Sequence, residues 1–116
     1  MQKTRIVLKV GSSNLSNGKI IDKAQIKALA QIIYELRECF DVILVSSGAM
    51  ASGYTALQID KNIMHNKQAL ASIGQPLLME SYREAFREYN IYVAQLLLVW
   101  RDFDSRKHTA FAQNTI

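Results

Sequence analysis

The stretch Ile6-Val-Leu-Lys-Val-Gly-Ser-Ser13 decides how this chain folds. Its first part, Ile6–Val10, is apolar and rich in β-branched residues, and it stops at Gly11, which predicts a buried strand followed by an abrupt turn. A second run of the same kind, Asp41–Val45, is followed by Ser46-Ser-Gly-Ala49. Two such runs predict two strands of one sheet, each ending in a loop of small residues.

The segment between these strands has the pattern of a helix. Asp22 is a suitable N-cap, and Gln25 stands three residues later as its reciprocal partner. Apolar side chains then recur at spacings of three and four, which places them on one helical face. A strand, a helix and a strand in this order predict a βαβ unit, a parallel sheet and the α/β fold class. The apolar positions are Ile26, Leu29, Ile33, Leu36 and Phe40.

Shorter signals fill the rest of the first half. Asn17-Gly18 lies between apolar residues and predicts a small hairpin. Small residues from 49 to 57 predict a tightly packed second helix, and the polar segment 58–64 predicts a surface loop.

The second half of the chain predicts further helix and strand. Residues 65–89 have helical spacing, but Gly74-Gln-Pro76 interrupts them and predicts either two helices or a sharp kink. The apolar run 91–99 predicts a third buried strand, and Asp102 or Asp104 is the expected cap of a last helix. Because the sheet is narrow and no stop signal precedes Ile116, residues 1–116 are expected to be the N-terminal part of a larger α/β domain.

Composition narrows the classes of partner. The chain has 116 residues and a net charge of +4, and its Lys and Arg residues are scattered, which does not favour a nucleic-acid partner. Cys39 is the single cysteine, as expected in a reducing compartment. The longest apolar run, 91–100, is about half of a membrane span, and no secretory signal precedes the first strand. We therefore expect a cytoplasmic location and no membrane partner.

Lys9 is the first candidate for chemistry. Ligands of open α/β sheets bind beyond the carboxyl ends of the strands, where Lys9, Gly11 and Ser12 are expected. Gly11 permits close approach of the backbone, and the successive N–H groups of such a loop can hold an anion. The alternative is a lysine at the sheet edge whose stem packs while its ammonium group reaches water. The spacing also differs from that of a P-loop, in which the lysine follows the last glycine.

The loop after the second strand is the other candidate. Ser47, Gly48 and Ala49 open a helix, and a helix N-terminus offers free N–H groups and partial positive charge to a carboxylate or phosphate. The alternative is simple N-capping by a serine. Two loops suited to anions at the same edge of one sheet are better evidence for a ligand site than either loop alone.

Other polar residues form no chemical constellation. His65 and His108 are far apart in the sequence and are interpreted as surface residues. Asp102 and Asp104 follow the expected third strand, where a helix cap explains them equally well. The serines have no partner histidine in the order of a catalytic triad, and no metal-binding cluster is expected.

Four segments together resemble the N-terminal part of the glutamate kinases of the amino-acid kinase family. They occur in the family's order and at compatible separations, and they cover most of the chain. One of them, Lys67–Gln75, separates glutamate kinases from the aspartate and nucleotide kinases of the same fold. The segments are Val7-Leu-Lys-Val-Gly-Ser-Ser13, Val45-Ser-Ser-Gly-Ala-Met-Ala-Ser-Gly53, Lys67-Gln-Ala-Leu-Ala-Ser-Ile-Gly-Gln75 and Val93-Ala-Gln-Leu-Leu-Leu98.

The resemblance implies a fold, an activity and roles for residues. The fold is a partly complete three-layer α/β/α sandwich with a mainly parallel sheet. The activity is ATP-dependent phosphorylation of the γ-carboxylate of L-glutamate to glutamyl 5-phosphate, the first step of proline synthesis, with Mg²⁺ carried by the nucleotide. Lys9 is similar to the lysine that contacts the transferring phosphoryl group, with Gly11 and Ser12 beside it. Ser47, Gly48 and Ala49 resemble the glutamate-binding loop.

The resemblance has departures and leaves alternatives open. Phe111 stands where the family usually has asparagine, and Val99 replaces a threonine. The nucleotide-binding half and the second catalytic lysine are expected beyond residue 116, so the 116 residues alone are expected to be inactive. A homo-oligomer is also expected. The alternatives are another small-molecule kinase of the family, or a non-catalytic half-domain that serves in binding or assembly.

Overall fold

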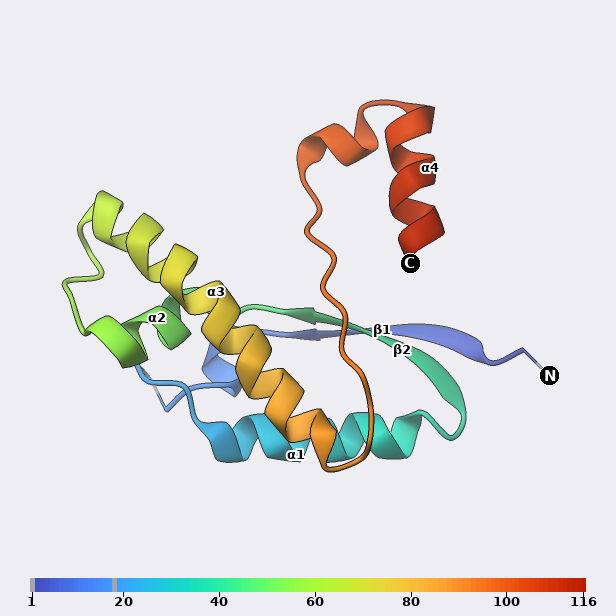
Figure 1. Cartoon of the computed structure of the whole chain (residues 1–116), viewed down its shortest axis with the longest axis horizontal. Helices are drawn as coiled ribbons and strands as arrows, with labels where there is room; N and C mark the ends of the chain where they lie inside the picture. The colour runs from blue at the N-terminus through green and yellow to red at the C-terminus, as the bar shows by residue number, and fades with distance from the viewer. Residues whose placement is uncertain (1, 18) are drawn as a thin grey trace.

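The computed structural model describes residues 2–17 and 19–116, and Figure 1 shows the arrangement of its elements. Three helices gather beside two long strands, while the last helix stands apart from them. The elements are β1 (Thr4–Val10), the 3₁₀ turn η1 (Ser12–Asn14), α1 (Lys23–Leu36), β2 (Phe40–Ser46), α2 (Ala49–Leu57), α3 (Met64–Arg87), the 3₁₀ turn η2 (Trp100–Phe103) and α4 (Arg106–Thr115).

The two strands form a parallel sheet. Their register runs from Thr4 opposite Phe40 to Val10 opposite Ser46, so both strands end at the same edge. Parallel neighbours need a crossover, and α1 supplies it. The predicted βαβ unit and the α/β class are confirmed.

Side chains alternate between the two faces of this sheet. Leu8 on β1 and Leu44 on β2 pack against the core cluster, whereas Val7 and Val45 lie on the other face and are 65% and 46% exposed. Of the three layers expected, the described residues therefore form the sheet and one helical layer. The buried residues of the core cluster come from the loop before α1, from α1 and from α3: Leu15, Ile26, Leu29, Ala30, Ile33, Leu78, Tyr82, Ala85 and Phe86.

Helix α1 begins as the sequence predicts. The N–H of Ala24 donates to Oδ1 of Asp22 at 3.0 Å, so the predicted cap is confirmed. Before it, Ser16 and Ile21 form an isolated antiparallel bridge, and the N–H of Asn17 donates to the carbonyl of Ile20 at 3.1 Å. Gly18 of the predicted hairpin turn lies outside the described residues.

Helices α2 and α3 pack through glycines. A Cβ added at Gly53 would lie 2.0 Å from the carbonyl oxygen of Leu70, and one added at Gly74 would lie 1.6 Å from that of Ala49. Real Cβ atoms do not approach so closely, so only glycine permits this separation of the two helix backbones.

The sequence predicts two helices or a sharp kink at Gly74-Gln-Pro76, and the division into two helices is wrong. Helix α3 continues from Met64 to Arg87 with Pro76 inside it. Proline removes one backbone hydrogen bond, but Leu70 before it and Leu78 after it are both buried, so tertiary packing holds the two halves in one helix.

The predicted third strand at residues 91–99 is also wrong. Within the described chain, no strand pairs with this segment, although Ile91 and Val93 pack against the core cluster. Tyr92 and Leu97 are 97% and 72% exposed. A β-rich sequence becomes a strand only when a neighbouring strand accepts its backbone hydrogen bonds, and β1 and β2 pair only with each other here.

The last helix is capped by a residue that the sequence reading did not select. The hydroxyl of Ser105 accepts from the N–H of His108 at 3.2 Å, so neither Asp102 nor Asp104 caps α4. The carboxylate of Asp102 instead accepts from the N–H of Val99 at 2.7 Å, one turn earlier. Both aspartates precede the helix, and spacing alone did not distinguish them from Ser105.

None of the helices in the described part of the chain is both long enough and apolar enough to cross a membrane.

Candidate functional site

The two candidate loops meet at the carboxyl edge of the sheet. Val10 and Ser46 are the last paired residues, and the N–H of Ser47 donates to the carbonyl of Val10 at 3.0 Å. Gly11 follows β1 directly and Gly48 lies just beyond β2. The structure thus brings together the two loops that the sequence singled out, because parallel strands in register end side by side.

Lys9 lies on the outward face of β1. It pairs in register with Val45, and its neighbours Leu8 and Val10 point to the core cluster. The side chain is exposed, and it makes no hydrogen bond or ion pair with any residue that the structure describes. Within residues 2–17 and 19–116, the ammonium group therefore carries no desolvation penalty from burial.

The loop after β1 is short and open. Gly11 has φ −86° and ψ 165°, which is extended backbone, and a Cβ added there would meet nothing closer than Ser13 Oγ at 4.0 Å. Space for a ligand, not backbone strain, is therefore what glycine provides here. The N–H groups of Ser12 and Ser13 have no hydrogen-bond partner among the described residues, and both residues are exposed.

The loop after β2 depends on its glycine. Gly48 has φ 116°, in the left-handed region that side chains disfavour, and it is the N-cap of α2. Among the residues that the structure describes, no side chain caps this helix, so simple N-capping by Ser46 or Ser47 is not what the structure shows. The N–H groups of the first turn, from Ala49 onward, are the open positive end of a helix.

A hydrogen-bond chain supports this second loop from the core side. The Ser46 hydroxyl donates to the carbonyl of Ser47 at 2.8 Å and lies 2.5 Å from the hydroxyl of Tyr82 on α3. Burial raises the pKa of Tyr82 above its ordinary value of 10.0, and the hydrogen bond with Ser46 opposes part of that shift. The helical spacing of residues 65–89 predicts that Tyr82 lies on a helix, but it says nothing about which hydroxyl the side chain meets.

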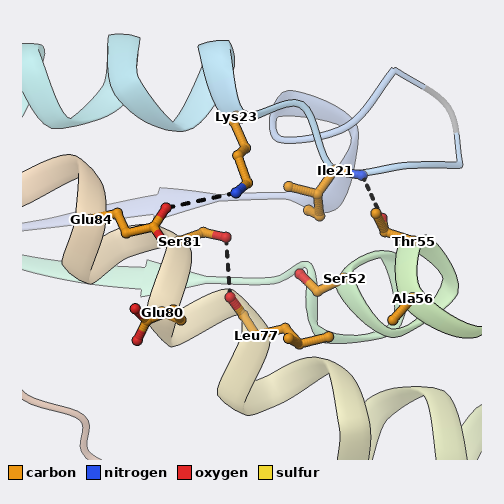
Figure 2. A pocket seen from close by; sticks show the side chains of 9 residues that line it. All are labelled: Ile21, Lys23, Ser52, Thr55, Ala56, Leu77, Glu80, Ser81 and Glu84. Carbon is orange, nitrogen blue, oxygen red and sulfur yellow. Dashed lines mark hydrogen bonds and ion pairs between the residues drawn. The ribbon is translucent and has the colours of Figure 1, made fainter.

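A separate pocket of about 250 Å³ lies between the start of α1, α2 and α3 (Figure 2). The Lys23 ammonium lies 3.7 Å from a carboxylate oxygen of Glu84, and the N–H of Ile21 donates to the hydroxyl of Thr55 at 3.1 Å. Ser52 is buried, and its hydroxyl has no partner among the described residues, so a water molecule in the pocket would satisfy it. No residue of the two loops lines this pocket. Its lining consists of Ile21, Lys23, Ser52, Thr55, Ala56, Leu77, Glu80, Ser81 and Glu84.

Residues that the sequence analysis judged weaker do not join the two loops. His65 lies on α3 and His108 on α4, while Asp102 and Asp104 belong to the segment around η2. Within residues 2–17 and 19–116, no group of three or more His, Cys, Asp or Glu side chains is arranged to hold a metal ion.

Comparison with known proteins gives a consistent relationship. The model of the amino acid kinase family matches residues 4–116. A protein of Helicobacter hepaticus named glutamate 5-kinase is 78% identical over the whole chain, which spans 44% of that relative. A glutamate 5-kinase of Leishmania donovani is 52% identical over 97% of the chain, which covers 43% of that relative. A protein of Bacillus subtilis named glutamate 5-kinase 1 is 40% identical over the whole chain, which covers 33% of that relative. The chain thus spans less than half of the curated relatives that it matches.

Proposed function

Because this chain belongs to the amino acid kinase family, we propose that it is the N-terminal half of an enzyme that phosphorylates the γ-carboxylate of L-glutamate with ATP. The observation that carries the proposal is the 78% identity, over all 116 residues, to a protein named glutamate 5-kinase. The product is glutamyl 5-phosphate, and the reaction is the first step of proline synthesis. The half of the domain that binds the nucleotide lies beyond residue 116 in this proposal.

The reaction joins two anions. An oxygen of the glutamate γ-carboxylate attacks the γ-phosphorus of ATP, a new O–P bond forms, and the bond to the β-phosphate oxygen breaks so that ADP leaves. The attacking carboxylate is ionised at neutral pH, so no general base is needed to activate it. The protein's task is to position the two groups and to offset their repulsion.

The two loops suit this task. The exposed ammonium group of Lys9 and the free N–H groups beside Gly11 and Ser12 supply positive potential for the transferring phosphoryl group. Ser47, Gly48 and Ala49, at the N-terminus of α2, supply a hydroxyl and N–H groups for the glutamate carboxylate. We therefore assign Lys9 a catalytic role and the Ser47–Ala49 loop a role in substrate binding.

The described residues fit a nucleotide that brings its own metal ion. Lys9 and the loop after β1 offer donors to phosphate, whereas the described chain offers no cluster of carboxylates for a resident cation. Mg²⁺ held by the phosphates of ATP would neutralise charge on the transferring group. We also propose that the complete protein is cytoplasmic and homo-oligomeric.

A substrate panel with the full-length protein tests the proposal. ATP is supplied with L-glutamate, L-aspartate, N-acetyl-L-glutamate or UMP, ADP release is measured, and acyl phosphate is trapped with hydroxylamine. We expect turnover and hydroxamate formation with L-glutamate above all other acceptors. Strong turnover with UMP and none with glutamate would favour another kinase of the family, and no turnover with any acceptor would favour a non-catalytic role.

A further inference from the structure

A buried tyrosine hydroxyl lies behind the Ser47–Ala49 loop. Tyr82 is 4% exposed, and its ring belongs to the core cluster on α3. Its hydroxyl lies 2.5 Å from Ser46 Oγ, and Ser46 is the last residue of β2, immediately before the loop. A polar group at this depth is expensive to bury without a partner, and its partner is the residue that leads into the loop.

The direction of the hydrogen bonds follows from counting protons. A serine hydroxyl has one proton, and that of Ser46 is donated to the carbonyl oxygen of Ser47 at 2.8 Å. The bond between Tyr82 and Ser46 must then be donated by Tyr82. The chain runs from Tyr82 through Ser46 to the Ser47 carbonyl, and each bond in such a chain strengthens the next.

Holding this carbonyl also orients the next N–H. The peptide bond between Ser47 and Gly48 is trans, so its N–H points away from its C=O. With the Ser47 carbonyl bound to Ser46, the Gly48 N–H points away from Ser46 and has no partner among the described residues. The orientation of this peptide decides whether its N–H is available to an anion.

We propose that Tyr82 is a positioning residue: through Ser46, its hydroxyl holds the Ser47–Gly48 peptide in the orientation that presents the loop's N–H groups to a bound carboxylate. That the carboxylate belongs to glutamate rests on the function proposed above, whereas the orientation of the loop does not. Tyr82 touches no reacting atom in this proposal and acts only through the loop.

The test compares Tyr82→Phe and Ser46→Ala in the full-length protein, with Tyr34→Phe as the matched control. Tyr34 is 47% exposed and stacks on Tyr89, with ring centroids 4.4 Å apart, away from the loop. We expect hydrogen exchange of the two bonded amides of this region, Ser47 (to the Val10 carbonyl) and Ser52 (to the Gly48 carbonyl), to be about 3- to 10-fold faster in both variants, the scale of one lost hydrogen bond. Combining the two substitutions should add little to either one, because they break the same chain.

Kinetics supply the second measurement. For glutamate, KM should rise about 3- to 10-fold in Tyr82→Phe while kcat stays within about 2-fold, and Tyr34→Phe should change neither. Unchanged exchange in the loop would overturn the proposal, even if the variant melts at a lower temperature. If the wild-type protein does not phosphorylate glutamate but exchange in the loop still rises, the proposed function fails and the positioning of the loop by Tyr82 is supported.

Discussion

At the scale of single residues, Lys9 and Ser47 lie at positions where their side chains do not pack in the core cluster. Lys9 extends from the outward face of β1, and Ser47 follows β2 without capping α2. Neither side chain is needed for the core cluster, which lies on the opposite face of the sheet. Their substitution is therefore expected to change activity far more than stability.

Lys9→Ala in the full-length protein is expected to lower kcat about 10²- to 10³-fold, the usual loss for one preorganised electrostatic donor. Lys27→Ala, which removes an exposed lysine from α1, is the control and should leave the rate unchanged. Steady-state kinetics with glutamate and ATP make the measurement. A rate for Lys9→Ala within a few-fold of wild type would remove Lys9 from the mechanism.

Ser47→Ala is expected to raise KM for glutamate more than it lowers kcat, because in the proposed function the hydroxyl binds the substrate equally in the ground and the transition state. Steady-state kinetics with glutamate and ATP measure both constants. Since Gly48 and not Ser47 is the N-cap, helix stability offers no competing explanation for such a change. An unaltered KM would show that the hydroxyl takes no part in binding.

Tyr82 gives a prediction for pH. Burial raises the pKa of its hydroxyl above 10.0, so the folded protein keeps a proton that the unfolded chain loses first. This contribution to stability is complete below pH 10 and is lost as the pH rises through the folded pKa. The free energy of unfolding should therefore fall more steeply above pH 10 in the wild type than in Tyr82→Phe.

Denaturant titrations across this pH range compare the two proteins. The two proteins differ only at residue 82, so the difference between their curves isolates Tyr82. If the free energy of unfolding fell equally with pH in the two proteins, the folded state would not hold the Tyr82 proton more tightly than the unfolded chain does.

At the scale of elements, the contact between α2 and α3 sets the position of the Ser47–Ala49 loop. Ala49 begins α2, and its carbonyl lies against Gly74 of α3. The segment Lys67–Gln75, which carried much of the resemblance to glutamate kinases, is thus the part of α3 on which the start of α2 rests. Its glycine, Gly74, lies inside the helix and permits the close packing of the two backbones.

Gly74→Ala is expected to lower the free energy of unfolding by about 1–3 kcal/mol, because an added methyl group would require the two helices to separate. The loop would move with α2, so KM for glutamate should rise as well. Ser72→Ala, at an exposed position on the same helix, is the control. Denaturant unfolding and kinetics together check it, and a Gly74→Ala protein of unchanged stability and KM would contradict the close contact.

At the scale of the whole molecule, the chain leaves apolar surface without cover. Val7 and Val45 are exposed on the outward face of the sheet, and Leu97 and Trp100 on the segment leading to α4 are 72% and 88% exposed. The radius of gyration is 15.7 Å, against about 13 Å for a compact domain of this length. Figure 1 shows the cause, because α4 stands away from the other elements.

The 116-residue chain expressed by itself is therefore expected to aggregate, because exposed apolar side chains in such number favour association in water. Light scattering after size exclusion measures it, with the full-length protein as the control. A monodisperse monomer that unfolds cooperatively would contradict the expectation and would mean that the outward face of the sheet tolerates solvent.

The sequence by itself determined β1, α1 and β2 and their order. Periodic apolar residues and the Asp22 cap specified α1, the two β-branched runs specified β1 and β2, and the small residues after each strand marked the loops. These features depend on neighbours a few residues away, so a linear pattern carries them.

Only the tertiary structure decided the rest. Pro76 stays inside one helix because buried residues on both sides of it hold α3 together, and residues 91–99 form no strand because no partner strand lies beside them. The bond between Tyr82 and Ser46 joins residues 36 positions apart, and Gly74 meets Ala49 across two helices. Each of these outcomes depends on which distant segments touch, and a contact between distant segments leaves no periodic mark in the sequence.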